Sequence, residues 1–123
     1  MQNKTLKKKH SDSITTIEDL RKLTANFVNE RDWKSYHKPR ALAEAISIES
    51  AELLEQFLFQ PPDYIPENIE LLTDEMSDIF IYLMSLCNAL KLPSFSQEVF
   101  RKMEKNKQKY PISKYSGENY QKQ

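Results

Sequence analysis

The chain has 123 residues, a length that suits one compact domain with a modest hydrophobic core. Acidic and basic side chains balance at 18 each, so no overall charge favours a nucleic acid or an acidic surface as partner. A single cysteine excludes an internal disulfide. No signal-peptide pattern and no bilayer-spanning apolar run is present, so we expect a cytoplasmic protein that binds neither nucleic acid nor membrane.

Residues 1–13 hold a basic cluster that stands apart from the otherwise balanced charge. Its members are Lys4, Lys7, Lys8, Lys9 and His10. Short basic runs at a terminus are usually solvated, so we expect a disordered tail rather than a nucleic-acid-binding arm.

Four helices are predicted along the rest of the chain. The only glycine is Gly117 and the prolines mark segment boundaries, which favours long helices over a sheet. Thr15 or Thr16 can cap a first helix of about 15 residues. Pro39 suits the first position of a second helix, which we expect to run to about Phe59.

The second half of the chain continues this helical pattern. Prolines within residues 60–66 exclude a helix there, so this segment is a predicted loop. A third helix is expected from the last residue of that loop to about Leu90. A fourth, capped by Ser94, should end near Tyr110, and we expect the polar tail from Ile112 onward to be irregular.

The third predicted helix is apolar on more than one side between Glu67 and Leu90. A helix with apolar residues nearly all round is buried on nearly all sides. Four helices of this size rarely supply so much burial alone, so we expect a homodimer or a homotetramer. The alternative is an unusually thick core within one chain.

Four carboxylates fall on the apolar faces of the second and third predicted helices. They are Glu49 and Glu52, followed after a spacer of 22 residues by Glu75 and Asp78. Each pair has i,i+3 spacing, which puts its Cβ atoms about 5–6 Å apart on one side of a helix. The spacer lets the second helix end and the third return, so the pairs can face each other.

The negative charges of these four acids have no basic residue on the same helical faces to balance them. At about 100° per residue, both pairs lie in the stripes expected to be buried, with no matching lysine or arginine. Unpaired buried carboxylates are costly, whereas Glu44 and Glu55 fall on solvated faces and need no partner. Oxygen ligands without histidine or cysteine favour Mg²⁺, with Mn²⁺ as a substitute. A di-iron site would require Glu-x-x-His pairs, and both i+3 positions are acidic.

The fourth predicted helix and the connector before Pro39 add residues suited to a nucleotide. Lys102, Lys105 and Lys109 share one helical face beside Asn106 and can bind phosphate, although surface lysines are more often only solvated. Aromatic groups near the acid-bearing helices can stack on a base, although each is individually more often core packing. The aromatic candidates are Trp33, Tyr36, His37, Phe59 and Tyr82.

The strings E-S-A-E and E-M-S-D together resemble the E-x-x-E…E-x-x-D signature of the all-α nucleoside triphosphate pyrophosphatases, the MazG-like superfamily. The dCTP pyrophosphatase branch is the most similar. The supporting strings are E-R-D-W at 30–33, H-K-P-R at 37–40, K-M-E-K-N at 102–106 and K-Y-P at 109–111. The resemblance covers residues 14–116, which we expect to form one four-helix-bundle-type domain, with 117–123 as a polar tail.

The resemblance implies Mg²⁺-dependent cleavage of a nucleoside triphosphate to the monophosphate and pyrophosphate. It also implies a role in removing unwanted nucleotides from the cellular pool. It implies four metal ligands, of which Glu49 or Glu52 would help to activate the attacking water. It also implies a set of substrate-binding residues. The implied metal ligands are Glu49, Glu52, Glu75 and Asp78, and the implied substrate contacts are Trp33, His37, Arg40, Phe59, Tyr82, Lys102, Asn106 and Lys109.

Two departures from the dCTP branch affect the expected substrate. Ala41 stands where asparagine is common, and Phe59 stands where tryptophan is common. A lost amide and a smaller stacking surface can loosen the preference for cytosine, so dCTP or a modified dCTP is expected first. The alternatives are the same reaction on dUTP or a phosphoribosyl-ATP-like nucleotide, a non-catalytic nucleotide- or partner-binding bundle, and a purely structural bundle.

Overall fold

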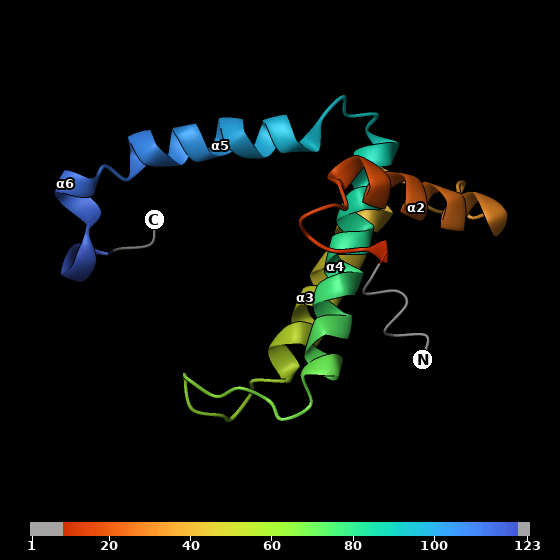
Figure 1. Ribbon diagram of the computed structural model, residues 1–123. Coiled ribbons are helices and arrows are strands. Elements are labelled where there is room, and N and C mark those ends of the chain that lie inside the picture. The colour runs from red at the N-terminus through yellow and green to blue at the C-terminus, as the bar shows by residue number, and fades with distance from the viewer. Residues whose placement is uncertain (1–8, 121–123) are drawn as a thin grey trace. The chain divides into compact units, whose positions relative to one another are not determined.

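A computed structural model of the chain describes residues 9–120 (Figure 1). Most of the predicted basic tail and the last three residues of the predicted polar tail lie outside the described residues. Every regular element between residues 9 and 120 is a helix, which confirms the all-α class. The elements are α2 (Ile17–Glu30), α3 (Pro39–Glu55), α4 (Ile69–Ala89), α5 (Phe95–Lys109), α6 (Ile112–Tyr115) and the 3₁₀ turn η1 (Gly117–Asn119).

The helices begin where short polar side chains or proline can satisfy their first turns. Thr16, rather than Thr15, caps α2: its hydroxyl accepts the backbone N–H of Asp19 at 3.1 Å, and the Asp19 carboxylate accepts that of Thr16 at 3.0 Å. These hydrogen bonds lower the pKa of Asp19. Pro39 opens α3 and Ser94 caps α5, so both predictions are confirmed.

Three predicted boundaries were wrong. The second helix ends at Glu55 rather than Phe59, because turns follow it and Phe59 adopts a left-handed backbone with φ of 64°. The third begins at Ile69, because the Asn68 side chain caps it by accepting the backbone N–H of Glu70 at 3.1 Å.

The third wrong prediction concerns the segment from Ile112 onward, which was expected to be irregular but contains regular structure. It forms α6 and η1, and the rings of Tyr110 and Tyr115 meet edge to face with centroids 5.3 Å apart. This contact between the end of α5 and α6 gives the short helix a packing partner, which polarity along the sequence does not reveal.

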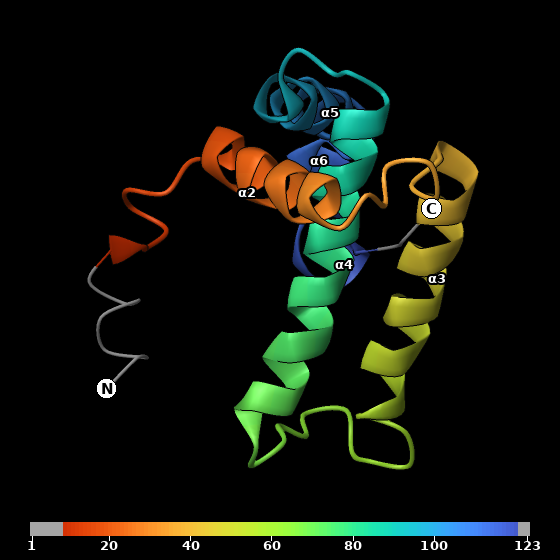
Figure 2. The same cartoon turned by 90° about the vertical axis from the view of Figure 1, so that its right-hand side faces the viewer.

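The chain divides after Leu92 into two compact units, the first with α2, α3 and α4 and the second with α5, α6 and η1. In the first unit α3 and α4 run antiparallel and side by side, and α2 crosses the C-terminal half of α4 (Figures 1 and 2). Side-chain hydrogen bonds between Arg21 and Asn88 join α2 to the end of α4. The buried apolar residues of this small core are Val28, Leu42, Met84 and Cys87.

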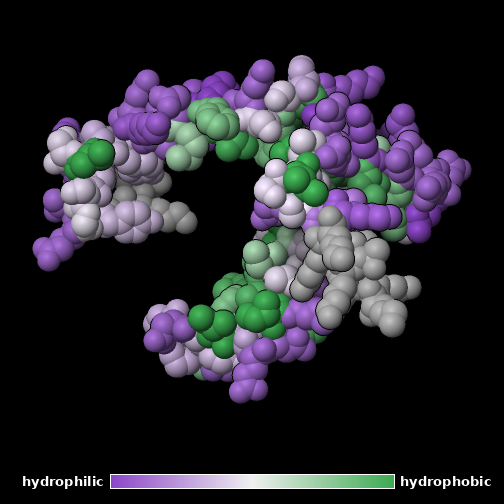
Figure 3. All heavy atoms as spheres, in the orientation of Figure 1, coloured by the Kyte–Doolittle hydropathy of each residue, from purple (hydrophilic) through white to green (hydrophobic). Residues whose placement is uncertain are grey.

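Cys87 is a free thiol whose position in this core raises its pKa, in keeping with an inert buried cysteine. Large apolar side chains elsewhere stay exposed, including Met76 and Ile81 of α4 at 51% and 44%. The nearly complete burial predicted for α4 is therefore absent within the single chain. Hydrophobic surface gathers at the end of the α3–α4 pair that carries the connecting loop (Figure 3). Between residues 9 and 120 no helix is long and apolar enough to cross a membrane.

Candidate functional site

The packing of α3 against α4 brings three of the four predicted acids together. Glu49 and Glu52 project from the last turns of α3 toward Glu75 in the second turn of α4, and each residue offers a carboxylate oxygen within 4.8 Å of the other two. Asp78 lies one turn further along α4 and is not a member of this group. We call Glu49, Glu52 and Glu75 the carboxylate group.

Burial differs within the predicted set. Glu49 and Glu75 are half-buried, and each keeps one carboxylate oxygen, Oε2, that is buried without a hydrogen-bond partner. Glu52 and Asp78 are exposed, so the prediction that all four acids lie in buried stripes was wrong for these two. The reason is that α3 and α4 cover only the surfaces that face each other, whereas periodicity alone marks a broader stripe.

The electrostatics of the carboxylate group disfavour three simultaneous negative charges. Burial, followed by hydrogen bonding and repulsion from Glu52, raises the pKa of Glu49 to about 7. Burial also raises the pKa of Glu75, and the charges of Glu52 and Asp78 add to that effect. Among residues 9–120, no lysine or arginine forms an ion pair with any member of the group.

Converging carboxylates, orphaned buried oxygens and the lack of a basic partner fit a bound cation. An all-oxygen donor set is the kind that Mg²⁺ or Mn²⁺ prefers. Because only deprotonated carboxylates bind a metal well, a divalent ion would also relieve the repulsion that raises the pKa of Glu49. The residues present therefore fit the metal that the sequence predicts.

An aromatic cavity of about 460 Å³ lies beside this group, between α2, the connector and α4. Trp33 and His37 stack with ring centroids 6.4 Å apart, and Phe27 meets Trp33 edge to face at 5.7 Å. Asp78 forms part of the wall, so the cavity begins one turn from Glu75. Its lining residues are Leu23, Thr24, Phe27, Val28, Trp33, His37, Asp78, Ile81, Tyr82 and Ser85.

Comparisons with known proteins place the chain in a family. The sequence model of the MazG-like family matches residues 45–122. The chain is 38% identical to dCTP pyrophosphatase 1 from Bos taurus over 106 residues, which are 81% of this chain and 62% of that protein. Over 102 residues it is 36% identical to dCTP pyrophosphatase 1 from Homo sapiens, covering 78% of this chain and 59% of the relative. The chain belongs to the MazG-like family.

A solved structure agrees with this MazG-like assignment. The crystal structure of a pyrophosphatase from Archaeoglobus fulgidus matches with a TM-score of 0.66 and 37% sequence identity, over 83% of this chain and 95% of that one. The chain spans about three fifths of the length of the curated relatives named above.

Within this MazG-like chain, three predicted base-contacting residues line the aromatic cavity: Trp33, His37 and Tyr82. Sequence reasoning missed Phe27 and Ser85 as cavity residues. Phe27 stands at an apolar position of α2, yet it is 45% exposed. Ser85 stands seven residues after Asp78, and this helical spacing was the available signal.

Other predicted contacts lie away from the carboxylate group or in the second unit. Arg40, in the first turn of α3, forms an exposed ion pair with Glu44 at 3.0 Å. Phe59 is fully exposed after α3 and does not line the aromatic cavity. The remaining three are on α5, whose unit we describe by itself, so their contact with substrate stays a prediction. They are Lys102, Asn106 and Lys109.

A wide acidic hollow of about 720 Å³ borders the carboxylate group at the loop end of α3 and α4. Glu52 and Glu75 form one wall, and Glu55 and Glu67 add two further acids. Negative charge on this surface would repel a polyphosphate that approached it without a bound cation.

Proposed function

We propose that this MazG-like protein is a metal-dependent nucleoside triphosphate pyrophosphohydrolase. It would hydrolyse the bond between the α- and β-phosphates, giving a nucleoside monophosphate and pyrophosphate. The observation that carries the proposal is the carboxylate group, which adjoins an aromatic cavity through Asp78. A metal site for phosphates beside a stacking site for a base is what this reaction requires.

The names of the relatives support this chemistry. Two similar proteins are called dCTP pyrophosphatase 1, and the structural neighbour is called a pyrophosphatase. We propose dCTP or a modified dCTP as the first substrate to test, in a role that removes unwanted nucleotides. Ala41 and Phe59 are the positions at which base preference would depart from that of the dCTP branch.

In the proposed mechanism, Glu49, Glu52 and Glu75 would hold Mg²⁺, and Asp78, one turn further along α4, would be a fourth ligand. Bound there, the ion would neutralise phosphate charge and make a water molecule more acidic. A carboxylate of Glu49 or Glu52 takes the proton of the attacking water, whose oxygen bonds to the α-phosphorus as pyrophosphate leaves.

The aromatic cavity positions the rest of the nucleotide in this proposal. Trp33 and His37 supply stacked rings for the base, and Tyr82 and Asp78 line the same cavity. We assign Lys102, Asn106 and Lys109, with Arg40, to the phosphates, because their charge and amide groups can bind the leaving pyrophosphate.

We further propose that the protein works as a homodimer or a homotetramer. Apolar residues on α3 and α4, including Ile48, Leu54 and Met76, are more than half exposed in the single chain. Apolar surface of this extent on a small domain is typical of an interface.

A product assay tests the activity. The protein with Mg²⁺ is incubated with common and 5-substituted nucleoside triphosphates, and monophosphate, diphosphate, pyrophosphate and phosphate are resolved. The Glu49→Gln, Glu52→Gln double variant should abolish activity, whereas Glu18→Gln, an exposed acid on α2, should retain it. Diphosphate plus phosphate would contradict the assigned bond. Nucleotide binding without any turnover would favour a non-catalytic binding bundle.

A further inference from the structure

The carboxylate group lies at the loosely packed end of the α3–α4 pair. We call residues 43–56 and 69–83 the acid half of the pair, and none of them belongs to the buried core. The buried residues of the two helices all lie at the opposite end, and they are Leu42, Met84, Ser85 and Cys87. Apolar burial therefore fixes the spacing of α3 and α4 less firmly beside the carboxylate group than at that opposite end.

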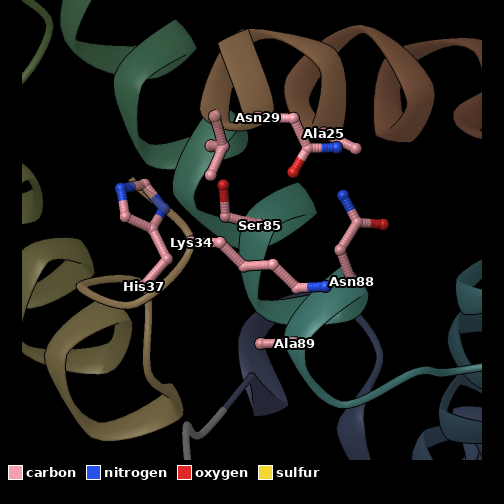
Figure 4. A pocket seen from close by; sticks show the side chains of 8 residues that line it. Ala25, Asn29, Lys34, His37, Ser85, Asn88 and Ala89 are labelled. Carbon is pink, nitrogen blue, oxygen red and sulfur yellow. The ribbon is translucent and has the colours of Figure 1, made fainter. Parts of the chain in front are cut away.

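The opposite end of α4 is also held by α2. Asn29 of α2 faces Asn88 of α4 there, across a cavity of about 180 Å³ (Figure 4). Asn88 accepts from Arg21 Nε at 3.1 Å and donates to the Arg21 carbonyl at 3.0 Å. These hydrogen bonds fix the last turns of α4, so the spacing of the acid half depends on other contacts.

Charge within the carboxylate group opposes a close approach of the two helices. Its three residues offer oxygens that lie within 4.8 Å of one another, and no lysine or arginine among residues 9–120 forms an ion pair with them. Like charges at this separation repel each other. In the absence of a cation, the acid half therefore favours a wider spacing than the one at which its carboxylates converge.

A hydrogen bond crosses from the end of α3 to α4 within the acid half. Gln56 donates through Nε2 to the backbone carbonyl of Leu71 at 2.9 Å. Gln56 is the C-cap of α3 and keeps a helical backbone, so it stands one turn beyond Glu52. Leu71 stands one turn before Glu75, and in an α-helix its carbonyl also accepts the Glu75 backbone N–H. The bond thus joins the two turns that adjoin these carboxylates.

The residue type at position 56 suits a link beside a metal site. Gln56 is half-buried, and it lines the acidic hollow together with Leu71, Glu52 and Glu75. Its amide is uncharged, so it joins the helices without neutralising a carboxylate. A lysine or arginine at this position would pair with the carboxylates and compete with a cation. An amide link leaves the carboxylates free to bind metal.

We propose that Gln56 is a positioning residue for the metal site, because its amide holds α3 and α4 at the spacing at which Glu49, Glu52 and Glu75 converge. The inference rests on the metal site of the proposed function. Without this hydrogen bond, repulsion would let the acid half open in the metal-free protein, and a cation would bind only the fraction of molecules that is closed. Affinity falls in proportion to that fraction.

Binding of Mn²⁺ to the metal-free protein, followed by electron paramagnetic resonance at about pH 8, tests this role without nucleotide or turnover. Gln56→Met keeps the side-chain length but removes the donor, and it should raise the Kd for Mn²⁺ about three- to tenfold, the range expected for one lost hydrogen bond. Gln56→Asn, whose amide is one methylene shorter, should give a similar rise.

Two control variants separate this effect from other causes. Gln60→Met makes the same chemical change at an exposed position of the loop and should leave the Kd unchanged. Arg21→Ala loosens α2 from the opposite end of α4 and should also leave the Kd unchanged, so it controls for lower stability alone. Thermal melting shows that each variant is folded at the temperature of the titration.

Hydrogen exchange in EDTA supplies a measurement that does not depend on metal. Gln56→Met should quicken amide exchange several-fold in residues 72–76 and leave residues 84–88 at the rates of the unmodified protein. Equal acceleration in both segments would overturn the positioning role, because it would indicate a general loss of stability.

An unchanged Kd for Mn²⁺ in both Gln56 variants would also overturn the role, as would a rise no larger than that in Arg21→Ala. An absence of Mn²⁺ binding by the unmodified protein would overturn the role together with the metal site of the proposed function. A raised Kd in the Gln56 variants of a protein that releases no pyrophosphate from dCTP would leave the positioning role standing and overturn the proposed function instead.

Discussion

At the scale of single residues, Glu49 departs furthest from ordinary side-chain behaviour. Its pKa is raised to about 7, from 4.5, by burial and by Glu52. Between these values the folded protein binds a proton that the unfolded chain releases, so this group makes the metal-free protein less stable as pH rises from about 4.5 to about 7. In EDTA, Glu49→Gln should show a shallower loss of Tm over that range than the unmodified protein. The exposed variant Glu44→Gln should keep the original slope, and equal slopes in all three would contradict the assignment.

The same protonation should compete with metal binding. Glu49 holds a proton below about pH 7, so added Mg²⁺ should raise Tm by several degrees at about pH 8 and by much less at about pH 6. Thermal melting with and without Mg²⁺ measures this difference. The Glu49→Gln, Glu52→Gln variant should show no Mg²⁺-dependent rise at either pH. A rise of unchanged size in the variant would place the metal elsewhere.

At the scale of the elements, the contact between α2 and α4 holds one wall of the aromatic cavity. Arg21 and Asn88 exchange two hydrogen bonds, and Arg21 also donates to the Cys87 carbonyl at 3.3 Å near the end of α4. Arg21→Ala leaves half-buried polar groups unpaired and should lower the free energy of unfolding by about 1–3 kcal/mol. Urea denaturation measures the loss. Lys22→Ala, its exposed neighbour, is the control and should change stability by less than about 0.5 kcal/mol.

The connector between α2 and α3 contains a tryptophan whose fluorescence can report on ligand binding in the aromatic cavity. Trp33 is the only tryptophan in the chain, it stacks on His37, and it is 43% exposed. A pyrimidine nucleotide that enters the aromatic cavity should therefore quench or shift its fluorescence with a saturating dose dependence. Pyrophosphate alone lacks a base and should leave the spectrum unchanged. An equal response to both ligands would place the base outside this cavity.

At the scale of the whole molecule, the small buried core contrasts with the extent of exposed apolar surface. Light scattering should give a mass of two or four copies of the 14.5 kDa chain. The Ile48→Glu, Leu54→Glu double variant changes two exposed residues of α3. It should shift the protein toward the monomer, because an interface formed there would bury unpaired charge. Lys22→Glu is the control for added negative charge. A monomer at every concentration would contradict the oligomer proposal.

The sequence by itself determined the all-α class and much of the local helical structure. Thr16, Pro39 and Ser94 mark helix starts because capping depends on backbone groups within a few residues. The i,i+3 spacing of Glu49 and Glu52 predicted their shared side of α3 for the same reason. The side of a helix on which a residue lies can be predicted from its spacing in the sequence, without knowledge of the helix that packs opposite.

Only the tertiary structure decided which of these residues meet and what they enclose. It joins Glu75, but not Asp78, to Glu49 and Glu52, and it places Ser85 in the wall of the aromatic cavity. It also leaves Phe59 exposed, where the sequence predicted a substrate contact. Burial, raised pKa values and cavities depend on side chains contributed by different helices, and these contacts across long sequence separations do not appear in the periodicity of any one segment.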